Sequence, residues 1–366
     1  MDLGSSAGAI TIGISFHMAK RLFRLLKHYA RRTAESLPIN FYQRLLPRDF
    51  ISIYYHILSD QQLSHVSHLY DFKTPEMFES DLCYLSRYFT PISYDQLVEC
   101  LSTHNKLPPK TVLLTFDDGF KECFTVARPL LLKYGIPCIF FVATQLLDNR
   151  ELPTDLKISI CIDQAQKLDS PALISVLRQI NSEFDTELLD LMQFNLWAKG
   201  LITNDHRPSD RLLRILGVDE KSYLAEKQPY LTTQQVLQLH QEGFHIGSHS
   251  RRHEHFPELS PAEIMNNISI SCQSISNLTG QSQTPFAFPF SADGIQRELL
   301  KQIREEHSAV GLMFDGHGVE KQSDFLFSRM CGDSPKGYLP GISNLEVRIR
   351  NAYLEEISRA LHSRKP

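Results

Sequence analysis

Short apolar segments alternate with amphipathic helical segments along most of this chain, and this alternation constrains its fold more than any other feature. Residues 111–116 (TVLLTF) and 136–143 (IPCIFFVA) have the composition of buried strands, and the helical segment 127–134 between them stops at Gly135. Strands separated by helices in this way lie parallel, with the helices outside. We therefore expect an α/β fold, a (β/α) barrel with insertions. The same alternation appears in the predicted strands 50–56, 244–248, 285–290 and 309–314 and the predicted helices 74–89, 233–242, 261–278 and 295–306.

Residues 147–228 interrupt the alternation. They contain amphipathic helical patterns, such as residues 186–197, but no clear strand. We interpret this segment as a helical insertion on the barrel, and more readily as a lid or packing element than as a source of catalytic residues. The expected organisation is a basic helical extension over residues 1–47, a barrel over 48–340 and a helix over 341–366.

The bulk composition limits the class of protein. The 366 residues include 42% hydrophobic and 22% charged side chains, which is an ordinary globular composition with enough apolar material for a core. The formal charge of −4 does not suit a polyanionic partner, so no nucleic acid is expected to bind. The 7 cysteines form no CxxC pair, which favours reduced thiols in a cytoplasmic protein.

The amino-terminal region fits neither a secretory signal nor a membrane span. Its apolar run, residues 7–16, is short and precedes the basic residues instead of following them. Residues 18–32 carry leucines at helical spacing among basic side chains, which favours a surface helix packed on the barrel. The alternative is a helix that lies on an anionic membrane face, which would make the cytoplasmic protein membrane-associated.

Two adjacent aspartates directly follow a predicted strand, in the sequence Thr115-Phe116-Asp117-Asp118-Gly119. Neighbouring buried carboxylates are costly unless a positive charge lies beside them. Successive side chains diverge at the end of a strand, so one aspartate can bind a cation while its neighbour faces a different target. An ordinary Asp-Gly turn with an acidic helix cap explains the pentapeptide equally well.

Two histidines four residues apart, His249 and His253, follow the predicted strand 244–248. If this segment turns helically, both imidazoles lie on one face and can bind one cation. Ser250 would then orient a ligand or brace the turn. Taken alone, two surface histidines in a basic loop explain the pattern better.

The two patterns support each other because both follow predicted parallel strands, whose carboxyl ends form the functional face of a barrel. Asp118, His249 and His253 would meet there as one oxygen and two nitrogen ligands, with positions left for water and substrate. Such an open set is typical of catalytic zinc. Similar ligands suit other ions, so we expect a divalent metal, with Zn²⁺ favoured over Co²⁺, Ni²⁺ and Fe²⁺.

The order of these motifs resembles the polysaccharide deacetylase family, the NodB-homology group also called carbohydrate esterase family 4. TFDDG at 115–119 resembles its first catalytic motif, and HSRRH at 249–253 resembles its metal-binding second motif. YYH at 54–56 is similar to its opening strand, and FAFPF at 286–290 to an aromatic variant of its third motif. The resemblance spans about residues 51–333 and implies a distorted (β/α) barrel of the NodB-homology type.

Carried over residue by residue, the resemblance implies a role for each of the first two motifs. Asp117 would be the general base, and Asp118, His249 and His253 would hold the metal. Metal-activated water would attack the acetyl carbonyl while the aspartate accepts its proton.

Further site residues are expected near the third motif and the last strands. Phe288, Pro289 and Phe290 would bind the substrate, although plain core packing explains them equally well. Many family members use a histidine near the end of the domain to protonate the leaving amine. His317 is the nearest candidate, with a turn residue as an equally good interpretation. Arg329 resembles an arginine that follows the last strands and braces the catalytic aspartate.

The predicted function is that of a carbohydrate deacetylase, a metal-dependent hydrolase that removes N-acetyl groups from an amino-sugar-containing glycan or glycolipid precursor. The resemblance implies a setting in bacterial envelope or exopolysaccharide biosynthesis, with an N-acetylated carbohydrate as substrate. Two alternatives stay open. One is an amidohydrolase of the same fold that acts on a non-sugar C–N bond, and the other is a catalytically inactive barrel that binds glycans.

Overall fold

The parts of the chain that the computed structural model describes are Ile39, Phe41, residues 50–316 and residues 324–362. The chain divides into two compact units, one of residues 49–344 and one of the two ends, 1–48 with 345–366. The predicted surface helix over 18–32 lies outside the described residues. In the smaller unit the described helix is α14 (Leu345–His362). None of the helices in the described parts is long and apolar enough to cross a membrane.

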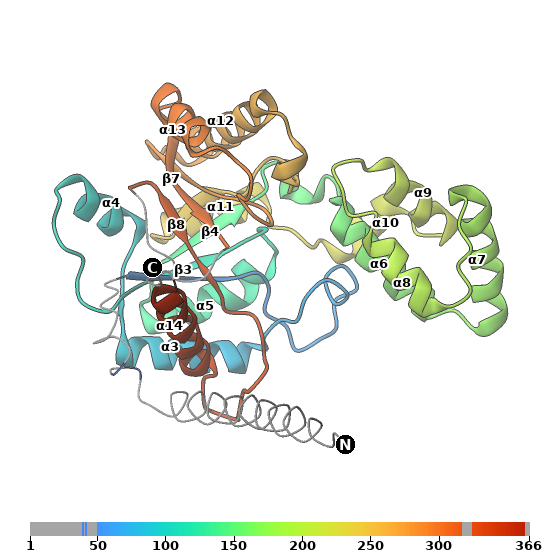
Figure 1. Cartoon of the computed structure of the whole chain (residues 1–366), viewed down its shortest axis with the longest axis horizontal. Helices are drawn as coiled ribbons and strands as arrows, with labels where there is room; N and C mark the ends of the chain where they lie inside the picture. Colours follow the sequence, from blue (N-terminus) through green and yellow to red (C-terminus); the bar gives the residue numbers. More distant parts are fainter. Residues whose placement is uncertain (1–38, 40, 42–49, 317–323, 363–366) are drawn as a thin grey trace, which may run out of the picture. The chain divides into compact units, whose positions relative to one another are not determined.

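A β-sheet forms the centre of the larger unit (Figure 1). Its strands are β1 (Phe50–Tyr55), β2 (Thr90–Pro91), β3 (Thr111–Phe116), β4 (Cys138–Val142), β5 (His245–Ser248), β6 (Thr284–Ala287), β7 (Val310–Asp315), β8 (Leu326–Ser328) and β9 (Met330–Cys331). They are hydrogen-bonded in the order β8-β7-β6-β5-β4-β3-β1-β9, with β2 paired to β3. Every one of these pairings is parallel, as the alternation of strands and helices predicts.

The two edge strands of this sheet, β8 and β9, are neighbours in sequence and are separated by Arg329 alone. Strand β8 pairs with β7 and strand β9 pairs with β1, so the chain passes from one end of the sheet to the other at this residue. The sheet thereby forms a nearly closed barrel, and the predicted (β/α) barrel is confirmed. In such a barrel the carboxyl ends of the strands open on one face.

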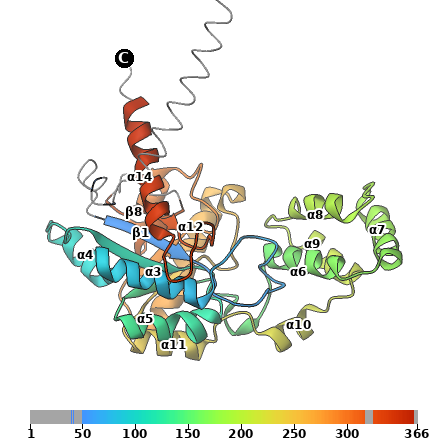
Figure 2. The same cartoon turned by 90° about the horizontal axis from the view of Figure 1, so that it is seen from below.

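Helices surround the barrel (Figures 1 and 2). They are α3 (Pro75–Tyr88), α4 (Tyr94–Ser102), α5 (Arg128–Tyr134), α11 (Thr233–Gln241), α12 (Pro261–Thr279) and α13 (Arg297–Glu306). Local signals set their ends: Ser260 and Glu263 form a capping box at the start of α12, and Gly280 ends it at a φ of 79°. Their apolar faces pack on the strands, and each fully buried leucine or phenylalanine contributes about 1.5–3 kcal/mol.

The segment between β4 and α11 forms a helical insertion to one side of the barrel (Figures 1 and 2). It contains α6 (Thr154–Gln166), α7 (Ser170–Phe184), α8 (Leu191–Lys199), α9 (Arg207–Ile215) and α10 (Glu220–Lys227). Leu177 and Phe194 of the insertion belong to the same buried apolar cluster as Phe120 and Leu146, which follow β3 and β4. The insertion is therefore packed against the barrel through a continuous core.

Several predicted elements are longer in the sequence analysis than in the structure, and two of them differ most at one end. The strand predicted over 285–290 ends at Ala287, because Pro289 has no N–H to donate to a sheet. The helix predicted over 186–197 begins only after Asp190, whose side chain caps its first turn.

Candidate active site

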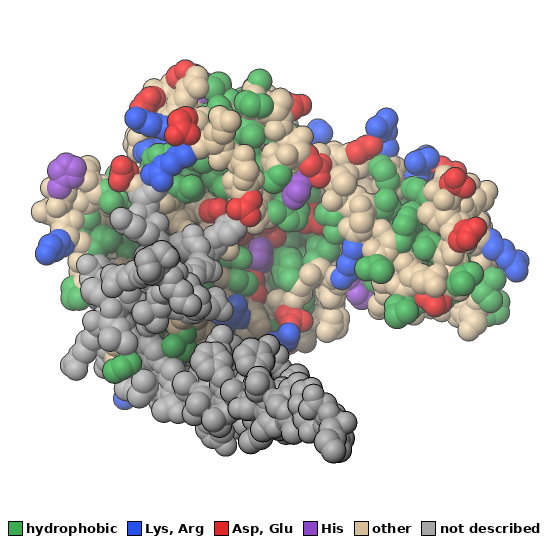
Figure 3. Space-filling view, in the orientation of Figure 1, with side chains coloured by type: hydrophobic (Ala, Val, Ile, Leu, Met, Phe, Trp, Pro, Cys, Tyr) green, Lys and Arg blue, Asp and Glu red, His purple; other side chains and the backbone are tan. Residues whose placement is uncertain are grey.

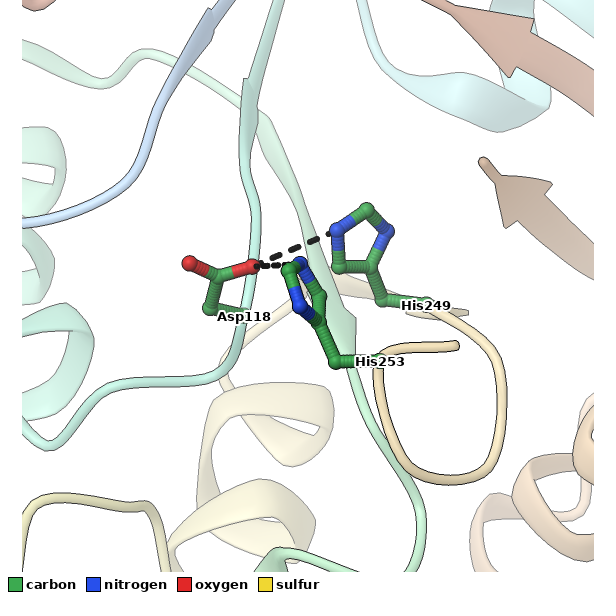
Figure 4. Close-up of side chains that lie close together, drawn as sticks. All are labelled: Asp118, His249 and His253. Carbon is green, nitrogen blue, oxygen red and sulfur yellow. Dashed lines mark ion pairs between the residues drawn. The ribbon is translucent and has the colours of Figure 1, made fainter. Parts of the chain in front are cut away.

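Three side chains from distant parts of the chain meet at the carboxyl ends of the strands (Figure 4). Asp118 follows β3, whereas His249 and His253 follow β5. Nε2 of His249 lies 3.3 Å from Oδ1 of Asp118, and Nε2 of His253 lies 3.2 Å from the same oxygen. The ligand atoms of the three residues all lie within 4.8 Å of one another. The three residues named as metal ligands in the sequence analysis are thus brought together around one point.

A left-handed turn at the end of β3 separates the two adjacent aspartates. The N–H of Asp117 donates to the carbonyl oxygen of Tyr55, at 2.8 Å, and so continues the sheet. Asp118 and Gly119 then adopt φ of 69° and 73°. Aspartate tolerates this region better than most residues, and glycine adopts it without steric cost. A Cβ at Gly119 would lie 3.0 Å from Val142, so the turn requires glycine, and it directs the two carboxylates to different partners.

The histidine motif is a loop, so the helical turn considered for residues 249–253 is wrong. The N–H of His249 donates to the carbonyl oxygen of Val142, at 2.9 Å, and extends the pairing of β4 with β5. Ser250 and His253 then have left-handed φ of 66° and 63°. The Ser250 hydroxyl accepts two of the following backbone N–H groups, at 2.9 and 3.3 Å, and this local hydrogen bonding replaces the helical pattern. Ser250 braces the turn that brings the imidazoles together.

In the neutral form of His249, an unprotonated ring nitrogen faces an oxygen of Asp118. The carbonyl oxygen of Ala287 lies 2.9 Å from Nδ1 of His249 and can only accept a hydrogen bond, so Nδ1 carries a proton, and in the neutral imidazole Nε2 is then the nitrogen with a free lone pair. Oδ1 of Asp118 is buried and receives no hydrogen bond from the described residues. With that imidazole neutral, a nitrogen lone pair 3.3 Å from a carboxylate oxygen is unfavourable unless a cation lies between them. The residues present therefore fit a metal ion.

Asp117 lies beside these residues and is held by Arg329. The guanidinium donates to both carboxylate oxygens, at 2.6 and 2.8 Å, and to the hydroxyl of Thr115, at 2.9 Å. The aspartate is 2% exposed and the arginine 1%. Burial raises the pKa of Asp117, but the guanidinium, together with His249 and His56, outweighs burial and holds this pKa below its usual value. Asp117 is therefore a carboxylate near neutral pH.

Another histidine, His56, immediately follows β1 and faces the same region. Its Nδ1 lies 2.5 Å from Oδ2 of Asp333, and its backbone N–H donates to Oδ1 of the same carboxylate at 3.1 Å. Burial lowers the pKa of His56, but Asp333, with Asp118 and Asp117, outweighs burial and raises it to about 9. The imidazole is therefore protonated near neutral pH. The sequence analysis gave this histidine no role, although its place at the carboxyl end of a barrel strand is a signal that points to the site.

These residues surround a cavity of about 310 Å³. Figure 3 shows acidic and histidine side chains gathered in a hollow of the surface. Phe288 and Phe290 line the cavity, whereas Pro289 is buried and does not line it. Phe290 is 47% exposed, and its ring lies 4.8 Å from that of His253. His317, the proton donor considered in the sequence analysis, lies outside the described residues.

The insertion contributes Asp155 and Ile202 to the wall of the cavity. Oδ2 of Asp155 lies 3.3 Å from Nδ1 of His253. The sequence analysis interpreted the insertion as a lid or packing element and did not predict a contact between it and His253. Asp155 is one of many acidic residues in the insertion, and the sequence alone gives no signal that distinguishes it from the others.

Comparisons with known proteins agree with the fold and the motifs. A family model described as polysaccharide deacetylase matches residues 104–312. No curated protein sequence matches the chain significantly. The solved structure of the Streptococcus pyogenes deacetylase PplD in complex with acetate is 15% identical over 84% of this chain and 96% of its own, with a TM-score of 0.50. IcaB from Ammonifex degensii is also 15% identical, over 78% of this chain and 92% of its own, with a TM-score of 0.50.

The two structural similarities show a shared fold. The family match is the stronger result, because it covers more than half of the 366 residues and includes both the aspartate pair and the histidine motif. This chain therefore belongs to the polysaccharide deacetylase family and is a carbohydrate deacetylase.

Proposed function

We propose that this protein uses a divalent metal ion, with zinc favoured, to remove N-acetyl groups from an amino-sugar-containing glycan or glycolipid precursor. The observation that carries the proposal is the convergence of three metal-binding atoms beside an ionised, buried aspartate in one cavity. Asp118, His249 and His253 would hold the ion as an open set of one oxygen and two nitrogens, which suits catalytic zinc and is also accepted by cobalt, nickel and iron. A bound ion lowers the pKa of water and polarises the acetyl carbonyl.

Asp117 is proposed as the general base. Its carboxylate lines the cavity and is ionised, and it has lone pairs beyond the two that Arg329 occupies. It would accept a proton from the attacking water as the water oxygen bonds to the acetyl carbon. Arg329 fixes the plane of the carboxylate and does not compete for the proton, because a guanidinium stays protonated up to a pH of about 12.

His56 is proposed as the proton donor. Cleavage of the C–N bond leaves an amine that needs a proton, and His56 lines the cavity in its protonated form. Asp333 binds the Nδ1 proton and so orients the ring. The resemblance to the family had suggested His317 for this role, and substitution of each histidine in turn distinguishes the two.

The cavity walls support an acetylated sugar as substrate. The lining residues Phe288, Phe290, Tyr70 and Ile202 present apolar and aromatic surfaces on which an acetyl methyl group and a sugar ring can pack. A volume of about 310 Å³ is at the low end of the range for small-molecule sites, so we expect one sugar residue to occupy it. The rest of a longer glycan would extend outside.

Release of acetate tests the proposal. Purified protein is incubated with N-acetylglucosamine oligomers and with non-sugar N-acetyl amides, before and after treatment with a chelator and after Zn²⁺ or Co²⁺ is restored. We expect acetate from the oligomers, loss of activity with the chelator, and recovery with the metal. Acetate from the non-sugar amides alone would instead favour an amidohydrolase. Binding of oligomers by a protein that takes up no metal and releases no acetate would favour an inactive glycan-binding barrel.

A further inference from the structure

The helical insertion places a buried carboxylate against one of the proposed metal ligands. Asp155 lies in the first turn of α6 and is 7% exposed. Its Oδ1 accepts the backbone N–H of Leu156 at 3.0 Å, and its Oδ2 lies 3.3 Å from Nδ1 of His253. The second contact has the distance of an ion pair, with an angle outside that of a good hydrogen bond. Within the described residues, His253 is the basic side chain that pairs with this carboxylate.

The position of the ring proton decides whether His253 can bind a metal through Nε2. A neutral imidazole carries one proton, and only the other nitrogen has a free lone pair. For His249, the carbonyl oxygen of Ala287 holds the proton on Nδ1. For His253, the carboxylate of Asp155 occupies the corresponding place, 3.3 Å from Nδ1, while Nε2 lies 3.2 Å from Asp118.

We propose that Asp155 is a positioning residue for the metal centre. Its negative charge, 3.3 Å from Nδ1, favours the proton of His253 on that nitrogen, leaves Nε2 free in the neutral ring, and keeps the ring beside Asp118. A carboxylate in this place also makes the ligand nitrogen more basic. The insertion then completes the metal centre in addition to forming a wall of the cavity. This inference rests on the proposed function, because it assigns a role toward the same metal.

The packing of the insertion fixes where this carboxylate lies. Leu156, the next residue in α6, is buried in the apolar cluster that the insertion shares with the barrel. Lys157 is 4% exposed and forms ion pairs with Asp210 of α9, at 2.6 Å, and Glu220 of α10, at 3.0 Å. The first turn of α6 is therefore held from several sides, and so is Asp155.

A purely structural role for Asp155 is the main alternative. An aspartate in a first helical turn stabilises the helix through its dipole and would do so without any metal. Asp163, in the same helix, provides a matched control. Its carboxylate also faces a histidine, since Oδ1 lies 3.7 Å from Nε2 of His68, but neither residue lines the cavity.

Titration of the metal-free protein with Co²⁺, followed by its visible absorption, and competition with Zn²⁺ test the proposal. We expect Asp155→Ala to weaken the Kd for both ions by about tenfold to a hundredfold and to change the Co²⁺ spectrum. Asp163→Ala should keep the Kd and spectrum of the wild type. Asp155→Glu, which restores a carboxylate, should recover part of the lost affinity. A helix-stabilising role would move the melting temperature in chelator, but not the Co²⁺ spectrum.

An Asp155→Ala variant whose Kd and spectrum equal those of Asp163→Ala would overturn the proposal. If Asp155→Ala shows no cooperative unfolding transition, Asp155→Asn takes its place, because its amide oxygen can still accept the N–H of Leu156. We expect weaker Co²⁺ binding in that variant as well, and an unchanged Kd would equally overturn the inference. Failure of the proposed function looks different, since the wild-type protein itself would then bind neither ion.

Discussion

Replacing Arg329 with methionine removes the guanidinium that holds Asp117 and leaves an apolar side chain of similar length. Asp117 is 2% exposed, and its two oxygens accept hydrogen bonds from the guanidinium at 2.6 and 2.8 Å. The variant therefore keeps a buried carboxylate without its partner. We expect separate effects on the pKa of Asp117 and on the free energy of unfolding.

The pKa of Asp117 should rise in Arg329→Met. In the wild type, burial raises this pKa, and the guanidinium is the strongest of the influences that lower it, so its removal leaves burial less opposed. A general base works only when it is ionised, and activity is therefore lost as the pH falls through its pKa. The acid limb of the kcat/KM profile should move to higher pH in the variant.

The free energy of unfolding should fall by about 3–5 kcal/mol near neutral pH, the usual cost of removing one partner of a buried ion pair. A carboxyl group with a depressed pKa in the folded state stabilises the fold above its unfolded pKa of about 3.9, and this stabilisation is lost as the pH falls through the folded value. The difference between wild type and Arg329→Met should therefore shrink in acid.

Urea denaturation at neutral and acidic pH and the pH profile of acetate release measure the two effects. The double variant Asp117→Asn/Arg329→Met is the control, because a neutral amide needs no counter-charge. Its loss of unfolding free energy should be smaller than the sum of the losses in the two single variants. An Arg329→Met variant with the acid limb and the unfolding free energy of the wild type would refute the reasoning.

Three other predictions concern the proton donor, the metal and the turn after β3. His56→Gln should lower turnover by about 10²- to 10⁴-fold and abolish a basic limb near pH 9, because the wild type loses its acid as the pH rises through about 9; pH–rate profiles check this. Asp117→Asn should keep its metal and lose turnover, whereas His249→Ala should lose both, as metal analysis and acetate release will show. Gly119→Ala should cost more than the roughly 1–2 kcal/mol of left-handed strain, since its Cβ would meet a neighbour at 3.0 Å. Gly135→Ala is the control, because Gly135 has a φ of 62° and nothing lies within 4 Å of the added Cβ. In urea denaturation this variant should lose only the free energy of left-handed strain. Equal losses of unfolding free energy at both positions would contradict the steric argument.

The sequence predicts those parts of the fold and site whose cause is local. Apolar runs of strand length separated by amphipathic helices indicate parallel strands, and the structure confirms the barrel. The same reasoning selects Asp118, His249 and His253, because each follows such a strand and the carboxyl ends of parallel strands share one face. The convergence of these three residues depends on the strand topology more than on the conformation of residues 249–253. It was therefore predicted correctly although the predicted helical turn was wrong.

Contacts that depend on the paths of loops and of the insertion could not be predicted in this way. The pairing of His56 with Asp333 joins residues 277 positions apart, and nothing in the local pattern around either residue points to the other. Asp155 meets His253 only because the insertion packs on the barrel through a shared apolar core. Such contacts are consequences of tertiary packing, which a single sequence does not reveal by periodicity.

The position of Arg329 between β8 and β9 ties the proposed catalytic base to the strands that bring the two edges of the sheet together. Arg329, whose guanidinium binds Asp117, is followed directly by β9, the strand that pairs with β1. A polypeptide leaving the ribosome amino terminus first would therefore carry both aspartates and both histidines for some time without an oriented base. Until residues 326–331 dock, the proposed base would lack the guanidinium that lowers its pKa, so full activity near neutral pH would require this end of the barrel to be in place.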